Sequence, residues 1–173
     1  MTAPPEEEIV QIVDQDNREI AAVTRSLMRS QQLIHRACYI FVFNAAGELF
    51  IQKRTKSKDI YPGYWDAAAG GVVLAGESYE AAAERELAEE LGLRKVKLEA
   101  LFDHYCEDAG NQVWGRIFRC RSEGPFTLQA EEVESGQFLP PAKVEELAAQ
   151  ELFTPDSLLL LRKILPQGEE KTV

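Results

Sequence analysis

Cysteine is scarce in this chain of 173 residues, and its spacing excludes the usual cysteine-based sites. The three cysteines, Cys38, Cys106 and Cys120, form no CxxC pair, and their odd number fits no disulfide framework. The sequence also lacks an N-terminal apolar segment of the kind that directs export, and any run of about 18 apolar residues. We therefore expect a cytoplasmic protein with reduced thiols and no membrane association.

Positive charge is also in deficit. The chain carries 19 Lys and Arg against 29 Asp and Glu, which gives a formal net charge of −10. This balance argues against nonspecific binding to nucleic acid or to anionic membranes, so an anionic substrate would need a local group of cations or a bound metal ion. The length and the hydrophobic share of 45% suit one domain, residues 1–173, with a substantial core.

The pattern of apolar residues predicts a mixed sheet with helices packed on it. Hairpins are expected in residues 9–25, around a polar turn, and in residues 37–54, around Gly47. The acidic start, residues 1–8, is expected to be disordered. Further strands are expected near 71–74, 95–107 and 111–122, and helices at 26–32, 78–91, 140–150 and 154–165.

A row of glutamates runs along the helix expected at 78–91. At about 100° per residue, Glu86, Glu89 and Glu90 share one arc of the helix, with Arg85 close enough to orient Glu89. Like charges at helical spacing cost roughly 0.2–0.5 kcal/mol per pair, so the arrangement needs an explanation. A solvated acidic face is the ordinary one. A hard cation such as Mg²⁺, which takes oxygen ligands, is the alternative.

The wider spacing around this helix favours the cation. The stretch fits the pattern G-x5-E-x7-R-E-U-x-E-E-x-G-U, in which U is a bulky aliphatic residue, at all nine fixed positions. Ordinary residue frequencies put the chance of such a match on the order of 10⁻⁹ per start site. The stretch resembles the Nudix box, and the chain is similar to Nudix hydrolases. The matching residues are Gly71, Glu77, Arg85, Glu86, Leu87, Glu89, Glu90, Gly92 and Leu93.

The resemblance implies an α/β/α sandwich with a mixed β-sheet, and hydrolysis of a diphosphate that is linked to another group. It also implies Mg²⁺, with Mn²⁺ as an alternative, held by Glu86, Glu89 and Glu90 and by a main-chain carbonyl near Gly71. Arg85 would assist catalysis by holding these ligands in shape.

Two further roles follow from the same resemblance. Glu77 would help Arg85 to hold the shell, and its place before the helix also suggests that it caps free N–H groups. The base that activates water would be Glu86 or Glu89. A carboxylate on a later loop, expected at residues 129–139, is the alternative. That loop carries Glu131, Glu132 and Glu134.

The resemblance extends to the isopentenyl diphosphate isomerase branch of the family. The stretch "HRACYIFVFNAAGELFIQKRTKSKDIYPGYW" shares with it an HRA, a QxR…SK segment and a PGxW. In that branch the residues that match Arg54 and Lys58 contact the substrate diphosphate, and Arg36 is a further candidate. The isomerases place a catalytic cysteine and a metal-binding histidine where this chain has Gly70 and Val72. We therefore expect an isomerase-like scaffold that carries hydrolase machinery.

Several alternatives stay open. The same fold could serve as a ligand-sensing module without catalysis, although a complete box argues against that. The acidic helix could bind a protein partner, and the isomerase reaction is disfavoured by the missing cysteine. The sequence does not identify the group linked to the diphosphate, the number of metal ions, or whether the protein is a monomer or a homodimer.

Overall fold

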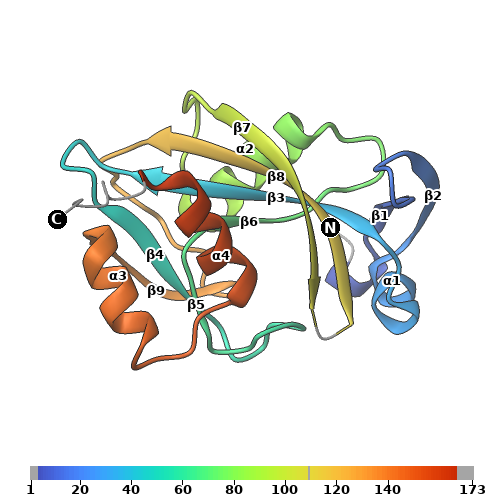
Figure 1. The fold of residues 1–173 in the computed structure, drawn as a ribbon. Helices are drawn as coiled ribbons and strands as arrows, with labels where there is room; N and C mark the ends of the chain where they lie inside the picture. Colours follow the sequence, from blue (N-terminus) through green and yellow to red (C-terminus); the bar gives the residue numbers. More distant parts are fainter. Residues whose placement is uncertain (1–3, 109, 167–173) are drawn as a thin grey trace, which may run out of the picture.

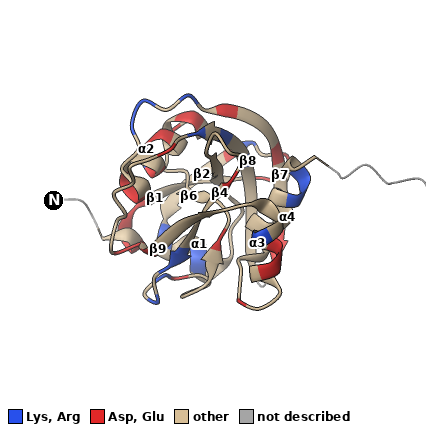
Figure 2. Ribbon diagram, turned by 90° about the vertical axis from the view of Figure 1, so that its left-hand side faces the viewer, with Lys and Arg blue, Asp and Glu red and all other residues tan. Residues whose placement is uncertain are grey.

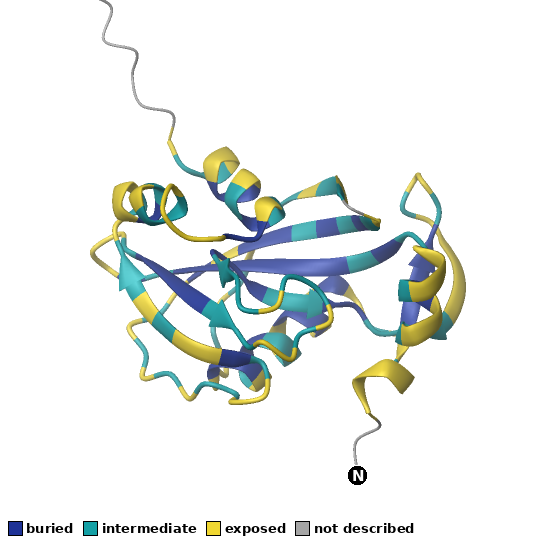
Figure 3. Ribbon diagram, turned by 90° about the horizontal axis from the view of Figure 1, so that it is seen from below, coloured by how far each residue is buried: buried dark blue, intermediate teal, exposed yellow. Residues whose placement is uncertain are grey.

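A nine-stranded mixed sheet forms the centre of the protein. A computed structural model describes residues 4–108 and 110–166 (Figure 1). Strand β3 (His35–Phe43) pairs in parallel with β8 (Asn111–Arg121) over its whole length, and antiparallel with β6 (Ala69–Val72). Strand β7 (Glu99–Asp108) pairs with the other side of β8. Because β3 is covered on both faces, its sequence is almost continuously apolar (Figure 3).

A second part of the sheet is built around β4 (Leu49–Arg54). It joins β3 at the register pair Phe43 and Leu49, and it pairs with β5 (Trp65–Asp66) and β9 (Val133–Leu139). The two parts of the sheet separate beyond this junction, and residues 52–54, at the far end of β4, lie where β4 has moved away from β3 (Figure 1).

Helix α2 (Tyr79–Leu91) covers one face of the sheet, and its sequence specifies both ends. Ser78 Oγ accepts a hydrogen bond of 3.0 Å from the Ala81 N–H, and Gly92 ends the helix with φ +67°. Leu87 and Leu91 are buried in the core between the helix and β3.

Helices α3 (Pro141–Ala148) and α4 (Pro155–Ile164) cover the opposite face of the sheet, over a core that includes Phe41, Leu160 and Leu161 (Figure 1). Layers of helix, sheet and helix confirm the expected α/β class. Among the described residues, no helix combines the length and the apolar character needed to cross a bilayer.

The N-terminal segment adds a hairpin and a short helix. Strands β1 (Ile9–Val13) and β2 (Glu19–Thr24) form the hairpin expected at 9–25, except that Arg25 begins α1 (Arg25–Gln31), which lies close to the expected helix. Residues 1–3 of the start expected to be disordered lie outside the described residues. Residues 5–7 of that start form a short 3-10 helix, Pro5–Glu7.

The structure corrects three other expectations. Residues 133–139, expected in a loop, form β9, because pairing with β4 supplies main-chain hydrogen bonds that their weak apolar alternation does not announce. Strand β6 starts two residues before the expected position, and β7 starts at Glu99 instead of residue 95.

Candidate active site

A cavity of about 90 Å³ opens where the two parts of the sheet diverge. Its lining includes the main chain of β6 at Gly70 and Gly71, with Cys38 and Tyr39 of β3 beside them. The glutamates of α2 lie next to this β6 main chain. The box therefore brings the end of β6 and the glutamates of α2 together beside the cavity.

Two of these glutamates have little exposure to solvent. The Glu90 residue is 5% exposed, and its Oε2 accepts hydrogen bonds from Gln52 Nε2 at 3.1 Å and from the Gly70 N–H at 3.3 Å. The Glu86 side chain is 13% exposed. Burial raises the pKa of Glu90 well above its usual range, and the charge of Glu86 raises it further. Burial also raises the pKa of Glu86.

The β6 main chain is in contact with Glu86. A Cβ atom at Gly71 would lie 2.6 Å from Glu86 Oε1, so only glycine leaves this carboxylate where it is. The Gly71 carbonyl, an expected metal ligand, accepts a weak hydrogen bond of 3.6 Å from Cys38 Sγ. Burial raises the pKa of Cys38, so this thiol stays protonated.

Arg85 ties the box together. Its Nε and Nη2 donate to the two carboxylate oxygens of Glu77 at 2.8 and 2.9 Å, and its Nη1 donates to Glu86 Oε1 at 2.8 Å. The same Nη1 reaches Glu89 Oε2 at 3.3 Å, and Nη2 donates to the Val72 carbonyl at 3.2 Å. One guanidinium thus holds three carboxylates and the end of β6.

Glu77 does not cap the helix, which corrects the sequence expectation. Its Oε1 accepts a hydrogen bond of 2.8 Å from the Leu74 N–H, and Ser78 caps the helix instead. Hydrogen bonds from Arg85 and from this N–H outweigh burial and lower the pKa of Glu77. Glu77 therefore acts as an ionised link between Arg85 and the loop before α2.

The box glutamates differ in accessibility. The Glu89 side chain is 50% exposed, in contrast to Glu86 and Glu90. Within the described part of the chain, no three His, Cys, Asp or Glu side chains form a ready-made group for an ion. The donor chemistry nevertheless fits a hard divalent cation, because Glu86 and Glu90 offer buried oxygens whose mutual repulsion a cation would relieve.

Four cations line the same cavity. Arg54 and Lys58, both expected there, come from β4 and the loop after it. Arg54 Nη1 donates to Asp66 Oδ2 at 3.3 Å, and Lys58 Nζ pairs with Glu132. The positive charge of Lys58 also acts to lower the pKa of both Glu86 and Glu90, although burial prevails.

The other two cations, Arg25 and Arg29, come from α1 and were missed by sequence reasoning. They share one carboxylate oxygen, Asp59 Oδ2, at 3.3 and 3.1 Å. Burial opposes ionisation of Asp59, but the two guanidinium groups prevail and lower its pKa to about 2. Figure 2 shows basic segments at α1, whereas α2 is largely acidic. Their spacing of four residues places both arginines on one helix face, which is the signal that could have found them.

Other expected site residues lie elsewhere. Arg36 donates to Asn17 Oδ1 at 2.8 Å and to Glu19 Oε1 at 3.0 Å, and it does not line the cavity. Among the alternative bases, Glu132 is bound to Lys58, whereas Glu131 and Glu134 are exposed. Glu134 lies on β9 and not on a loop.

The cavity is also lined by polar residues that were not anticipated from the sequence. Tyr39 Oη donates to Asp156 Oδ2 at 2.7 Å, and burial raises the pKa of both side chains. Asp66 lies close enough to raise the pKa of Asp156 further. His35 is buried beside the cavity, with Nδ1 3.0 Å from the Leu33 carbonyl.

Comparisons with known proteins agree with this geometry. The family model described as NUDIX domain matches residues 33–167. The chain is 42% identical to the Nudix hydrolase PA4841 of Pseudomonas aeruginosa over 94% of this chain and 96% of that one. It is 46% identical to the Nudix hydrolase YfcD of Escherichia coli over 89% and 84% of the two chains. The crystal structure of DR0079 from Deinococcus radiodurans has a TM-score of 0.81 at 24% identity, and the match covers 92% of this chain and all of that one.

Proposed function

Because this chain belongs to the Nudix family, we propose that it is a metal-dependent hydrolase that cleaves the phosphoanhydride bond of a diphosphate-linked small molecule, such as a nucleoside diphosphate derivative. The observation that carries the proposal is the pair of carboxylates Glu86 and Glu90, the first mostly and the second fully shielded from solvent, beside a cavity that four cations line. A divalent cation would neutralise the carboxylates, and the phosphates of a substrate would neutralise the cations.

Glu86 and Glu90, with Glu89 and the main chain at Gly71, would hold Mg²⁺ or Mn²⁺. When bound, such an ion neutralises charge on phosphoryl oxygens and lowers the pKa of a water molecule. Arg85 fixes the carboxylates of Glu86 and Glu89 in one orientation through the hydrogen bonds described above.

The cations on the cavity wall would orient the diphosphate. Lys58 is close enough to act on the pKa of Glu86 and Glu90, while Arg54 lines the cavity from β4 and Arg25 and Arg29 line it from α1. An arginine fork matches phosphate oxygens bidentately, whereas lysine acts as a point charge. Their contact with phosphate would hold the diphosphate near Glu86 and Glu90.

Glu89 is the group that we assign as the general base. It is half exposed and so reaches solvent water, and its one ion-pair partner among the described residues is Arg85 at 3.3 Å. Glu86 is less suited, because it is buried and lies against Gly71. A base must reach the proton that it accepts, which favours the accessible carboxylate.

A screen of diphosphate compounds with Mg²⁺ or Mn²⁺ tests the proposal, with release of phosphate or a monophosphate as the readout. We expect Glu89→Gln and Glu90→Gln each to lower turnover at least about a hundredfold without unfolding the protein. Glu84→Gln is the matched control, because Glu84 is exposed on the same helix. Absence of hydrolysis across the screen, with tight binding of one compound, would favour a ligand-sensing module instead.

The isomerase alternative needs its own assay. The position that matches the isomerase cysteine is Gly70, but Cys38 lines the same cavity as a buried, protonated thiol. Isomerisation also requires a group that removes a proton from the far side of the alkene. NMR of isopentenyl diphosphate incubated with the protein is expected to show no dimethylallyl isomer. Its appearance at an enzymatic rate would overturn the hydrolase proposal.

A further inference from the structure

Gln52 is a polar residue at a position where the strand pattern calls for an apolar one. On β4 its neighbours on the same face are Phe50, in the core under α2, and Arg54, at the cavity. Gln52 is 5% exposed. It therefore lies at the boundary between the apolar core and the candidate active site. A buried amide needs hydrogen-bond partners to offset its desolvation.

The partner of its amide nitrogen is a box glutamate. Gln52 Nε2 donates to Glu90 Oε2 at 3.1 Å, and the Gly70 N–H reaches the same oxygen. Among the described residues, both of these donors bind Oε2 and none binds Oε1. The carboxylate is thus fixed in rotation with one oxygen free, which is the arrangement of a carboxylate that binds an ion through its second oxygen.

The other end of the amide has no partner. Gln52 Oε1 is buried and, in the part of the chain that the structure describes, receives no hydrogen bond. The main chain of Gln52 cannot rotate to point this side chain in another direction, because it is paired with Gly136 of β9 on one side and with Asp66 of β5 on the other. When Glu90 is ionised, as binding of a cation requires, its carboxylate only accepts hydrogen bonds, so the Gln52 nitrogen then faces Glu90 and the oxygen faces away.

We propose that Gln52 is a positioning residue for the metal site. Its Nε2 holds Glu90 Oε2 and so keeps Glu90 Oε1 free, in the orientation in which it would bind a cation. This inference rests on the proposed function, because it assumes that Glu90 binds the ion. It assigns a role in ion binding to a residue outside the box.

Titration of the metal-free protein with Mn²⁺, followed by the EPR signal of the free ion, measures the effect without any substrate. Gln52→Met keeps the length of the side chain but removes both polar atoms. We expect it to weaken Mn²⁺ binding by roughly 10–100-fold, as the loss of a group that orients a ligand does. Gln137→Met is the matched control, because Gln137 is exposed on the neighbouring β9, and its Mn²⁺ affinity is expected to equal that of wild type.

Two further variants test whether Gln52 acts by positioning the Glu90 carboxylate or only by supporting the fold. Gln52→Asn keeps the amide but is one methylene shorter, so it cannot span the distance to Glu90, and we expect the same loss of affinity. Glu90→Gln is expected to weaken Mn²⁺ binding, and adding Gln52→Met to it is expected to cause no further loss, because Gln52 acts through Glu90. Gln52→Asn decides the question if circular dichroism shows that Gln52→Met is unfolded.

The outcomes also distinguish this inference from the proposed function. Wild-type affinity for Mn²⁺ in both folded Gln52 variants would overturn the role of Gln52 and leave the metal site intact. Failure of the wild-type protein itself to bind Mn²⁺ would overturn both. At saturating Mn²⁺, the KM of the Gln52 variants for a diphosphate substrate is expected to stay within about twofold of wild type, because Gln52 does not contact phosphate.

Discussion

At the scale of single residues, Arg85 holds more of the site than any one glutamate does. Its guanidinium reaches Glu77, Glu86, Glu89 and the Val72 carbonyl with its side chain 23% exposed. Lysine keeps the charge but cannot donate in these directions at once. We expect Arg85→Lys to lower turnover at least tenfold and the free energy of unfolding by about 1–3 kcal/mol.

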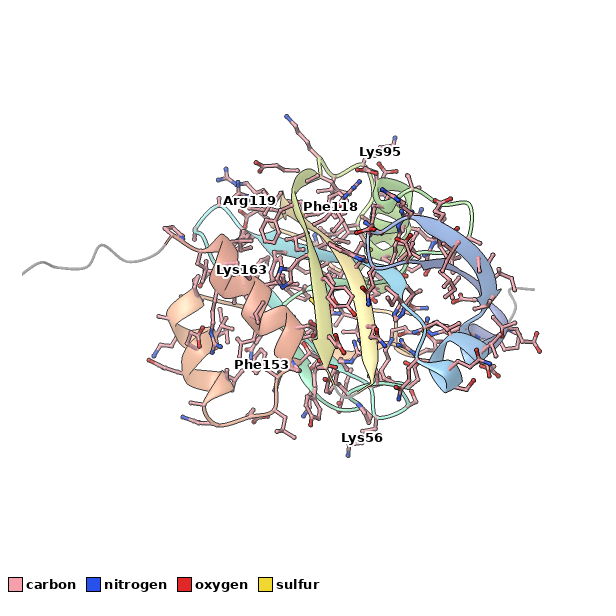
Figure 4. All side chains as sticks on the ribbon, turned by 45° about the vertical axis from the view of Figure 1, so that its right-hand side comes forward. Lys56, Lys95, Phe118, Arg119, Phe153 and Lys163 are labelled. Carbon is pink, nitrogen blue, oxygen red and sulfur yellow. The ribbon has the colours of Figure 1, made fainter. Side chains whose placement is uncertain are left out.

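Arg119→Lys is the control for Arg85→Lys. Arg119 donates twice to Glu99, but both side chains are largely exposed, and Figure 4 shows Arg119 at the outside of the molecule. Exposed ion pairs contribute little, so activity and the denaturation midpoint of this variant are expected to match wild type. If Arg85→Lys changed activity and stability no more than Arg119→Lys does, the charge of Arg85 alone, and not its hydrogen bonds, would account for its role.

The buried histidine makes the stability of the fold sensitive to acid. Burial lowers the pKa of His35 to about 4, from an ordinary value near 6.5. Between these two values the unfolded chain binds a proton that the folded protein does not, so stability rises with pH there. The contribution is complete above about pH 6.5 and is lost as pH falls toward 4. We expect His35→Phe to flatten this part of the stability profile.

NMR of the two histidines checks the cause directly, since the chain has no others. The His35 ring signals are expected to stay those of neutral imidazole down to about pH 5. His104→Gln identifies which signals belong to His35. Titration of the His35 ring near its ordinary pKa would contradict the interpretation.

At the scale of elements, α1 and the loop after β4 form the cationic wall of the cavity. We expect Arg54→Ala, Lys58→Ala and Arg29→Ala each to raise KM for a diphosphate substrate by about tenfold, and to change kcat less. The reason is that these cations contact phosphate in the ground state and the transition state alike. Steady-state kinetics on the best substrate of the screen measures both constants.

Lys56→Ala is the control for the cationic wall. Lys56 lies in the same loop as Lys58 but is exposed, and Figure 4 shows its side chain pointing away from the molecule. Its removal changes the net charge equally, so an equal rise in KM would mean that long-range charge, and not contact, attracts the substrate.

The elements differ in how far the sequence specified them. The extent of helix α2 was predictable, because its leucines and its terminal glycine are local signals, but its cap was not, since Ser78 caps the helix where Glu77 was expected. Strand β9 was not, because Glu134, Ser135 and Gly136 form a strand only against β4. For the same reason the box glutamates could be named in advance, whereas Arg29, Asp156 and Gln52 depend on which segments the fold brings together.

At the scale of the whole molecule, the acidic site couples metal binding to folding. Burial raises the pKa of Glu86 and Glu90, and a neighbouring charge adds to it, Glu89 for Glu86 and Glu86 for Glu90, so the metal-free folded protein binds protons that the unfolded chain has released. The stability of the metal-free protein therefore falls as pH rises above the ordinary Glu range. A cation binds the ionised forms, so the stabilisation by Mg²⁺ is expected to grow with pH.

Thermal unfolding in chelator and in Mg²⁺, at about pH 6 and about pH 8, measures this coupling. At a Mg²⁺ concentration about 100 times Kd we expect Tm to rise by about 5–10 °C, and more at the higher pH. In Glu90→Gln the rise is expected to be much smaller. A rise that is independent of pH in the wild-type protein would mean that the ion binds to carboxylates that are already ionised.

The parallel pairing of β3 with β8 has a consequence for biosynthesis. Residues 35–43 leave the ribosome long before residues 113–121, yet each strand supplies the other's main-chain partners. Until β8 emerges, the most apolar segment of the nascent chain has an unpaired edge, and its pairing must wait until residues 44–112 have been made and the loop that they form can close. We therefore expect this part of the sheet to form during synthesis only after β8 has emerged, and chaperones that shield extended apolar segments to bind β3 during that interval.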